Sequence, residues 1–201
     1  DGIDSDCDGA SEPFRSAAAA TGEWAGEDTS EYFASSIAAG DLNNDGFADL
    51  VTSAYEHDSS TWFNTGRIYV FFGTTTAPGT GLSASTADVT IDGESGGEEL
   101  GRTVAVFDAT GDGIDDLVAG APRGADGEGA AYLFAGPLSA GAWLSSDAET
   151  TIQTDAYGIG TFYGSVDAAG DWDGDGIDDI AFGIRTGAGK VGIFSSTART
   201  T

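Results

Sequence analysis

The chain has 201 residues, and its 34 aspartates and glutamates outnumber 7 lysines and arginines, which gives a formal net charge of −27. This charge excludes a nucleic-acid binder that works through a basic surface, and it argues against adhesion to anionic membranes. The longest strongly apolar run, Ile68 to Phe72, is far too short to span a bilayer, so we expect no membrane insertion. A hydrophobic content of 40% still predicts a chain that folds around a core.

The chain opens with an acidic segment, residues 1–13, that is a candidate metal site. Its oxygen-bearing side chains have the spacing of a metal-binding loop, at Asp4, Asp6, Asp8 and Glu12. The stretch DGIDSDCDG resembles a short metal-binding motif of bacterial surface proteins. A fourth calcium site and a solvated acidic segment both remain open, because no strands are expected to flank it. The single Cys7 cannot form a disulfide within the chain, so it pairs elsewhere or stays a free thiol.

Three later windows repeat one pattern of oxygen-bearing residues and glycine. They read DLNNDGFADL at 41–50, DATGDGIDDL at 108–117 and DWDGDGIDDI at 171–180, with oxygens at positions one, three, five and nine and Gly at position six. Alternate residues of an extended segment project to one side, and the glycine lets the chain turn sharply. A ring of hard oxygens without His or Cys selects calcium or magnesium, and calcium better tolerates irregular geometry.

An EF-hand is the obvious competitor, and the sequence argues against it. That motif needs a Glu at position twelve and helices on both sides. Position twelve is Thr52, Ala119 or Phe182 here, and the flanking residues alternate and are rich in Val, Ile, Phe and Tyr. This pattern predicts strands rather than helices beside each loop.

The loops belong to a repeat of more than 60 residues. Their first aspartates, Asp41, Asp108 and Asp171, are 67 and 63 residues apart. Apolar segments before and after each loop predict three strands in each unit, and a fourth is expected at Asp88–Ile91 and Glu149–Gln153 in the first two units. Four strands in a repeat of this length are typical of a propeller blade.

These units resemble the FG-GAP repeat of integrin alpha-subunit β-propellers and related bacterial surface proteins. The signature residues are Leu100-Gly101 and Tyr163-Gly164 before the first strand and Gly120-Ala121-Pro122 after the second, whereas the first unit departs with Phe33-Ala34. The resemblance implies an all-β domain at 14–201, with blades near 23–91, 92–153 and 154–201 and with 14–21 as an outer strand lacking its own blade. It places each calcium loop in a hairpin between two strands.

The resemblance also implies a ligand set for each of three calcium sites, with the backbone carbonyl serving at position seven. The expected ligands are Asp41, Asn43, Asp45, Phe47 and Asp49; Asp108, Thr110, Asp112, Ile114 and Asp116; and Asp171, Asp173, Asp175, Ile177 and Asp179. Because a hydroxyl is a poorer ligand than a carboxylate, we predict that the site with Thr110 is the weakest. Asp115 and Asp178, at position eight, are expected on the solvated surface.

The strand count predicts an incomplete propeller. The third unit offers three strands, and three blades are below the usual range of about four to eight. Two completions are open: further blades of a longer chain, or a homo-oligomer in which the N-terminal strand of one copy completes the third blade of the next.

Two functions follow as hypotheses. The first is a calcium-binding extracellular module for adhesion or for protein or glycan binding, in which calcium is structural; the alternative is a structural subunit of a head-to-tail extracellular ring or filament. An enzyme is not expected, because the only histidine, His57, is predicted to be a solvated loop residue.

Trp62 and Phe63 in the same loop either bind a partner or pack on a neighbouring blade. Inter-blade or core packing is expected for the other tryptophans, Trp24, Trp143 and Trp172.

Overall fold

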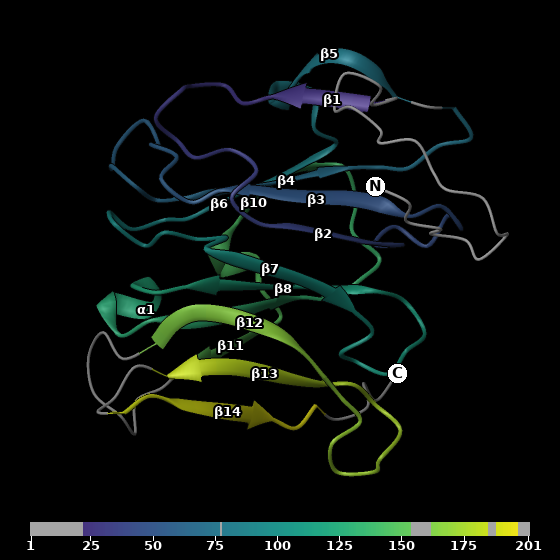
Figure 1. The fold of residues 1–201 in the computed structure, drawn as a ribbon, viewed down its shortest axis with the longest axis vertical. Helices are drawn as coiled ribbons and strands as arrows, with labels where there is room; N and C mark the ends of the chain where they lie inside the picture. Colours follow the sequence, from purple (N-terminus) through teal and green to yellow (C-terminus); the bar gives the residue numbers. More distant parts are fainter. Residues whose placement is uncertain (1–21, 77, 154–161, 185–187, 197–201) are drawn as a thin grey trace, which may run out of the picture.

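The computed structural model describes residues 22–76, 78–153, 162–184 and 188–196 as sheets stacked face to face in a row (Figure 1). The predictions for the acidic segment at 1–13, with its candidate ligands, and for a strand at 14–21 lie outside these residues. The predicted all-β fold of propeller blades is confirmed. No helix in the described part of the chain is long and apolar enough to cross a membrane.

Blade 1 is an antiparallel sheet of four strands that gains a fifth at its outer edge. Its strands, from inner to outer edge, are β2 (Ile37–Gly40), β3 (Asp49–Ala54), β4 (Arg67–Phe71) and β6 (Val89–Asp92). The fifth strand, β10 (Gly141–Leu144), comes from the second repeat and pairs in parallel with β6. The sequence predicted the four antiparallel strands and missed this added one.

Blades 2 and 3 repeat the same meander. Blade 2 consists of β7 (Thr103–Phe107), β8 (Asp116–Ala121), β9 (Ala130–Phe134) and β11 (Thr150–Gln153), with the single turn α1 (Gly124–Gly127) between β8 and β9. Blade 3 has three strands in the described residues, β12 (Phe162–Gly170), β13 (Asp179–Ile184) and β14 (Lys190–Phe194). The predicted fourth strands of the first two units are confirmed within one residue at each end.

A two-stranded sheet precedes blade 1. It pairs β1 (Gly22–Ala25) in parallel with β5 (Gly79–Ser83), as β6 pairs in parallel with β10. One short 3-10 turn follows each added strand, Ala84–Thr86 after β5 and Ser145–Asp147 after β10. This correspondence assigns β1 the role of β6, so β1 is the outer strand of a blade that would precede blade 1.

Apolar layers fill the spaces between successive sheets. On β4, Ile68 and Val70 join the core shared with blade 2, whereas Tyr69 and Phe71 join the core beneath β1 and β5. Because successive side chains of a strand point to opposite faces, a strand covered on both faces is apolar at nearly every position. This burial explains the continuous hydrophobic runs of the second and third strands of the first two units.

Hydroxyl groups join the inner strands of adjacent blades. Ser36 Oγ accepts a hydrogen bond from the Val104 backbone N–H at 3.0 Å, and Thr103 Oγ1 accepts one from the Val166 N–H at 2.9 Å. The two bonds are equivalent in the repeat, since Ser36 and Thr103 each lie five residues before the first aspartate of their loop. Each blade therefore holds the next one through a polar contact at its inner edge as well as through the apolar layer.

The tryptophans divide between buried and exposed positions. Trp24 packs against the core of blade 1, with its ring 4.8 Å from that of Phe71, and Trp143 packs against the core between blades 1 and 2, as predicted. The prediction is wrong for Trp172, whose residue surface is 72% exposed. Val191 on β14 is 76% exposed. Both residues belong to blade 3, which has no described blade after it to cover them.

Candidate calcium loops

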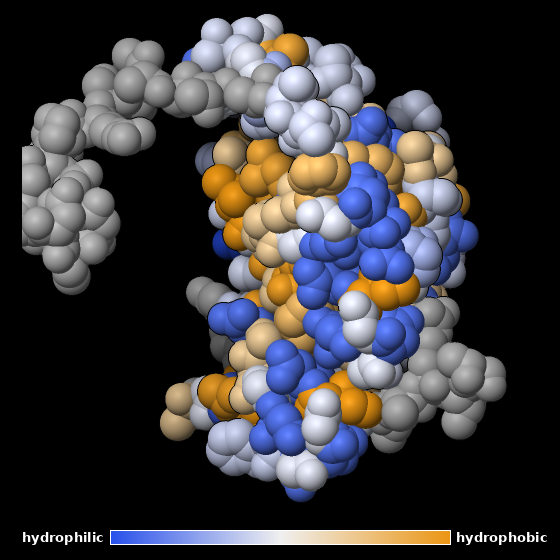
Figure 2. Space-filling view, turned by 90° about the vertical axis from the view of Figure 1, so that its right-hand side faces the viewer, coloured by the Kyte–Doolittle hydropathy of each residue, from blue (hydrophilic) through white to orange (hydrophobic). Residues whose placement is uncertain are grey.

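Three hairpin loops project from the same end of the three blades, on the right in Figure 1. Loop 1 (residues 41–49) joins β2 to β3, loop 2 (108–116) joins β7 to β8, and loop 3 (171–179) joins β12 to β13. Figure 2 views this end directly and shows hydrophilic residues gathered in a band that runs down the stack. Strand pairing thus brings three distant windows of the sequence to one end of the molecule.

Each loop uses two left-handed residues rather than the single one expected. Position six is glycine with φ between 86° and 92°, as its role in the turn requires. Position four is also left-handed and is occupied by Asn44 (φ 59°), Gly111 (φ 70°) or Gly174 (φ 84°). Glycine and asparagine tolerate this conformation best, so the residue type at position four was a signal from which the second left-handed residue could have been predicted.

The first aspartate of each loop is oriented by the turn that follows it. Asp41 accepts hydrogen bonds from the Asp45 and Gly46 N–H groups, and Asp171 accepts from those of Gly174 and Gly176. In loop 2 the same place is taken by Asp108, which accepts from Gly111, Asp112 and Gly113. These bonds fix the carboxylate over the concave side of the turn and leave further lone pairs for another ligand.

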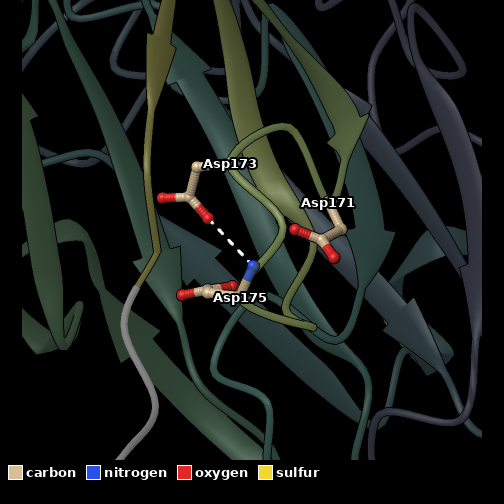
Figure 3. A group of neighbouring side chains, drawn as sticks. All are labelled: Asp171, Asp173 and Asp175. Carbon is tan, nitrogen blue, oxygen red and sulfur yellow. Dashed lines mark hydrogen bonds between the residues drawn. The ribbon is translucent and has the colours of Figure 1, made fainter.

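Loop 3 brings its predicted side chains together most clearly. Asp171, Asp173 and Asp175 are exposed, and one carboxylate oxygen from each lies within 4.8 Å of the others (Figure 3). The Asp175 N–H donates to Asp173 Oδ1 at 3.2 Å, which holds the third and fifth positions side by side. Three like charges at this spacing repel one another, and a divalent cation would relieve that repulsion.

Loop 1 brings its third and fifth positions together in a different way. Asn43 Nδ2 donates to Asp45 Oδ2 at 2.9 Å, and the Asp45 N–H donates to Asn43 Oδ1. In all three loops the aspartate at position five accepts from the N–H at position seven, which belongs to Phe47, Ile114 or Ile177. The donor set of every loop is therefore oxygen-rich and suits a hard cation.

The aspartate at position nine is buried and ties each loop to the far end of the hairpin that follows. Asp49, Asp116 and Asp179 are at most 1% exposed, and each accepts two backbone N–H bonds. One donor lies near the start of the same loop and the other just beyond the third strand of the blade: Leu42 and Gly73, Thr110 and Gly136, and Trp172 and Ser196. The resemblance implied a ligand here; the structure adds a second, architectural role.

Burial raises the pKa of Asp116 to about 6, although the N–H donors from Gly136 and Thr110 oppose this rise. Burial raises the pKa of Asp49 in the same way. A buried carboxylate with a raised pKa carries a charge that its surroundings compensate incompletely. A cation in the loop would offset this buried negative charge, so Asp49 and Asp116 are suited to a loop that holds calcium.

Thr110 and Ile177 lie at the junction between loops 2 and 3. Thr110 is 4% exposed and Ile177 is 8% exposed, and the Ile177 side chain fills the space above Gly111, where a Cβ atom would come 2.8 Å from it. A bulkier residue at position four of loop 2 would therefore clash with blade 3. The conformation of loop 2 depends on the next blade as well as on its own residues.

Asp115 is not the solvated surface residue that the sequence predicted. It is half-buried, and its Oδ2 accepts a 2.8 Å hydrogen bond from the backbone N–H of Asp41, in the neighbouring loop. Asp41 is the first residue of loop 1, so a position-eight side chain of blade 2 helps to place the candidate site of blade 1. Asp178 is also half-buried.

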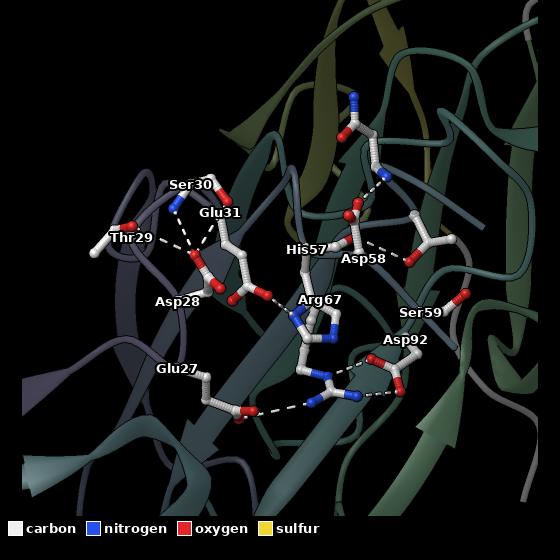
Figure 4. Close-up of polar contacts among 12 residues, drawn as sticks. Glu27, Asp28, Thr29, Ser30, Glu31, His57, Asp58, Ser59, Arg67 and Asp92 are labelled. Carbon is white, nitrogen blue, oxygen red and sulfur yellow. Dashed lines mark hydrogen bonds and ion pairs between the residues drawn. The ribbon is translucent and has the colours of Figure 1, made fainter. Parts of the chain in front are cut away.

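At the opposite end of blade 1, the structure corrects the prediction for His57. Only 6% of its surface is exposed, and its Nδ1 lies 2.9 Å from Glu31 Oε1 (Figure 4). Trp62 and Phe63, in the same connection, are 54% and 79% exposed. The two rings therefore remain available for contact with another molecule.

Comparisons with known proteins agree with the loop architecture. The FG-GAP repeat family matches residues 33–71 and 100–134. The chain is similar to Integrin alpha-4 of Xenopus laevis, at 30% identity over 80% of this chain, and to Integrin alpha-PS5 of Drosophila melanogaster, at 33% identity over 79%. It is also similar to Phosphatidylinositol-glycan-specific phospholipase D of Rattus norvegicus, at 32% identity over 77%.

The chain spans only 15% of each of the two integrin subunits and 19% of the phospholipase. The matched repeats coincide with the loops and strands of blades 1 and 2, and blade 3 has the same loop and hydrogen bonds. The chain therefore belongs to the FG-GAP repeat family, with the integrin-alpha type of β-propeller blade.

Proposed function

We propose that the chain is a calcium-binding extracellular β-propeller module whose ions stabilise the blades and whose opposite end binds a protein or glycan. The observation that carries the calcium part is the convergence of the Asp171, Asp173 and Asp175 oxygens within 4.8 Å in loop 3. The repetition of the same turn and the same carboxylate bonds in loops 1 and 2 supports it.

The role of calcium in this proposal is structural. Side chains at positions one, three, five and nine and the carbonyl at position seven would hold it, and it would supply positive charge against the clustered carboxylates. The position-nine aspartates link this charge to the body of the blade through their buried N–H bonds. Occupied loops would therefore stiffen the connection between a hairpin tip and the neighbouring blade.

An extracellular location is part of the proposal. Cytosolic calcium is scarce, so exposed carboxylate loops of this kind suit the outside of a cell. The two integrin alpha relatives support this location, and the excess of acidic residues suits a calcium-rich medium.

Calcium titration by isothermal calorimetry tests the calcium part. The chain should bind three equivalents in the described loops, with loop 2 the weakest because Thr110 supplies a hydroxyl. Asp173→Asn should remove or weaken one site, whereas the matched Asp178→Asn, five residues along the same loop, should leave the count unchanged. Equal titration curves for wild type and Asp173→Asn would overturn the assignment of loop 3.

The recognition part rests on Trp62 and Phe63, which lie in the connection between β3 and β4, away from the calcium loops. Exposed aromatic rings in a propeller loop can stack on sugars or dock against a protein. Glycan-array and cell-adhesion measurements with Trp62→Ala/Phe63→Ala should show a loss of binding at unchanged stability. Trp172→Ala, at the other end of the blades, is the matched control.

The structure of the terminal sheets favours a second candidate, a head-to-tail assembly. Strand β1 is an outer strand without a described blade of its own, and β14 has no described outer neighbour. In that assembly, β1 of one copy would pair with β14 of the next. Deletion of residues 1–25, which removes β1, should abolish the higher-mass species in size-exclusion chromatography with light scattering; an unchanged mass would reject the assembly.

A further inference from the structure

Blades 1 and 2 differ at the end opposite the calcium loops, where blade 1 contains two basic side chains. The Arg67 guanidinium donates from Nη2 to Asp92 Oδ2 at 2.8 Å and lies 3.6 Å from Glu27 Oε1 (Figure 4). It also stands over the Tyr69 ring, 6.0 Å from the ring centroid. His57 contacts Glu31 beside it. Blade 1 therefore places its own side chains, Arg67 and His57, against the carboxylates at this end.

Blade 2 keeps the acidic and aromatic residues of this cluster but has no basic residue at the positions of His57 and Arg67; its own Arg102 and Arg123 instead pair with Glu99. The 67-residue interval between loops places Glu94 at the position of Glu27 and Glu98 at that of Glu31, and the strand register places Tyr132 at that of Tyr69. The same relations replace the basic residues by small ones. His57 becomes Gly124, and Arg67 becomes Ala130, which pairs with Gln153 as Arg67 pairs with Asp92.

A solvent-open hollow of about 350 Å³ lies at this place in blade 2. Its walls include the counterparts of all three groups around the Arg67 guanidinium, namely Glu94, Tyr132 and Gln153. Glu98 also lines the hollow. The hollow in blade 2 therefore lies where the Arg67 guanidinium lies in blade 1, and the corresponding residues line it.

Glu98 has a buried carboxylate oxygen without a partner beside this hollow, and its blade 1 counterpart, Glu31, also has one. Glu98 is 1% exposed, and its Oε2 accepts bonds from the N–H groups of Glu94 and Ser95 and from the Ser95 hydroxyl. Among the described residues, its Oε1 is buried without a hydrogen-bond partner. A buried carboxylate oxygen without a donor is costly, so such an atom beside a hollow indicates a ligand that donates hydrogen bonds.

We propose that this hollow between blades 1 and 2 is a binding site for a guanidinium group, with Glu98 and Glu94 as its carboxylate partners and Tyr132 as its aromatic wall. A planar guanidinium offers several donors in a fixed fork and stacks on aromatic rings, as Arg67 does in blade 1. Glu94 Oε2 already accepts the Ser146 N–H at 2.8 Å, which fixes this carboxylate at the rim. The guanidinium comes either from free arginine or from an arginine side chain of a partner.

Titration of the calcium-saturated chain with methylguanidinium chloride, followed by calorimetry and backbone NMR, tests the site. One equivalent should bind and shift the resonances of Glu94, Glu98 and Tyr132, whereas methylammonium, which lacks the planar fork, should bind at least about tenfold more weakly. No binding, equal binding of the two cations, or competition by further calcium would overturn the proposal.

Two variants change the site in opposite directions. Glu98→Gln keeps an acceptor for the Glu94 and Ser95 donors and removes the charge, so methylguanidinium binding should fall about tenfold or more. Gln153→Asp restores the carboxylate that Asp92 provides in blade 1, so binding should strengthen. Unchanged affinity in both variants would contradict the proposed role of these residues.

A third variant fills the hollow with a side chain of the protein itself. Ala130→Arg/Gln153→Asp copies the Arg67–Asp92 pair into blade 2 and should abolish methylguanidinium binding while thermal melting shows a folded chain. If this variant does not fold, Glu98→Gln and Gln153→Asp still decide the proposal. Comparison of L-arginine with an acetylated and amidated Gly-Arg-Gly peptide then distinguishes the two sources, since tighter binding of the peptide indicates an arginine side chain and tighter binding of L-arginine indicates the free amino acid.

Discussion

Loops 2 and 3 share a motif and differ in what covers them. In loop 2, position two is Ala109, which is 2% exposed and belongs to the core shared with blade 3. In loop 3, position two is Trp172, which is 72% exposed. At position three, Asp173 of loop 3 is exposed as well, whereas Thr110 of loop 2 is buried. The motif therefore determines the conformation of the turn, and packing against the next blade determines how much of the loop is buried.

Removal of calcium should have the largest effect. If free calcium is about ten times the dissociation constant, each site contributes about 1.4 kcal/mol, so three sites contribute about 4 kcal/mol. Differential scanning calorimetry with calcium and with EGTA should show a fall in Tm of about 8 to 16 °C for a chain of this size. The same Tm in both buffers would show that the carboxylate turns are stable by themselves.

The covering of position two is tested by a pair of substitutions. Leu42→Ala in loop 1 removes a side chain that is 0% exposed and packs in the core between blades 1 and 2, so it should cost about 2–5 kcal/mol. Trp172→Ala should change the free energy of unfolding by less than about 0.5 kcal/mol. Urea denaturation measures both. A large loss in Trp172→Ala would mean that loop 3 is covered, which is expected only in a larger assembly.

The position-nine aspartate is expected to matter even without calcium. Asp116→Ala leaves the buried N–H groups of Thr110 and Gly136 without their acceptor, at about 1–3 kcal/mol each. Relief of the buried charge offsets part of this cost, so we expect a net loss of about 2–4 kcal/mol by urea denaturation in EGTA. Asp112→Ala, an exposed residue of the same loop, is the control and should cost less than about 1 kcal/mol.

The smallest expected effect concerns the bond between loops. Asp115→Ala removes the acceptor of the Asp41 N–H and should cost about 0.5–1 kcal/mol, together with a slightly weaker calcium affinity in loop 1. Asp178→Ala is the matched change in loop 3, whose carboxylate has no hydrogen bond to the Asp108 N–H among the described residues. Calorimetric titration should separate the two variants, and equal effects would refute a cross-loop role for Asp115.

The spacing of residues along the chain predicted much of the fold, because strands and turns have short-range patterns. Alternating apolar runs gave the hairpins, and Asp45-Gly46 or Asp112-Gly113 gave the sharp turns between them. The parallel strand β10 was missed because Gly141–Leu144 is short and its partner, β6, lies in another repeat.

Other features depend on neighbours that a single sequence does not reveal. Asp115 has the composition of a surface residue, and only the packing of blade 2 on blade 1 brings it to Asp41. His57 is buried because Glu31, 26 residues earlier, reaches it from the connection between β1 and β2. By contrast, the left-handed conformation at position four of each loop could be predicted from the sequence, because that position is occupied by Gly or Asn.

Anomalous diffraction from crystals grown with calcium tests the central claim most directly. The account predicts an anomalous peak in each of the three described loops, about 2.3–2.6 Å from oxygens at positions one, three, five, seven and nine. The peak in loop 3 should lie among Asp171, Asp173 and Asp175. Loops filled only by water at calcium concentrations that saturate the calorimetric titration would contradict the account.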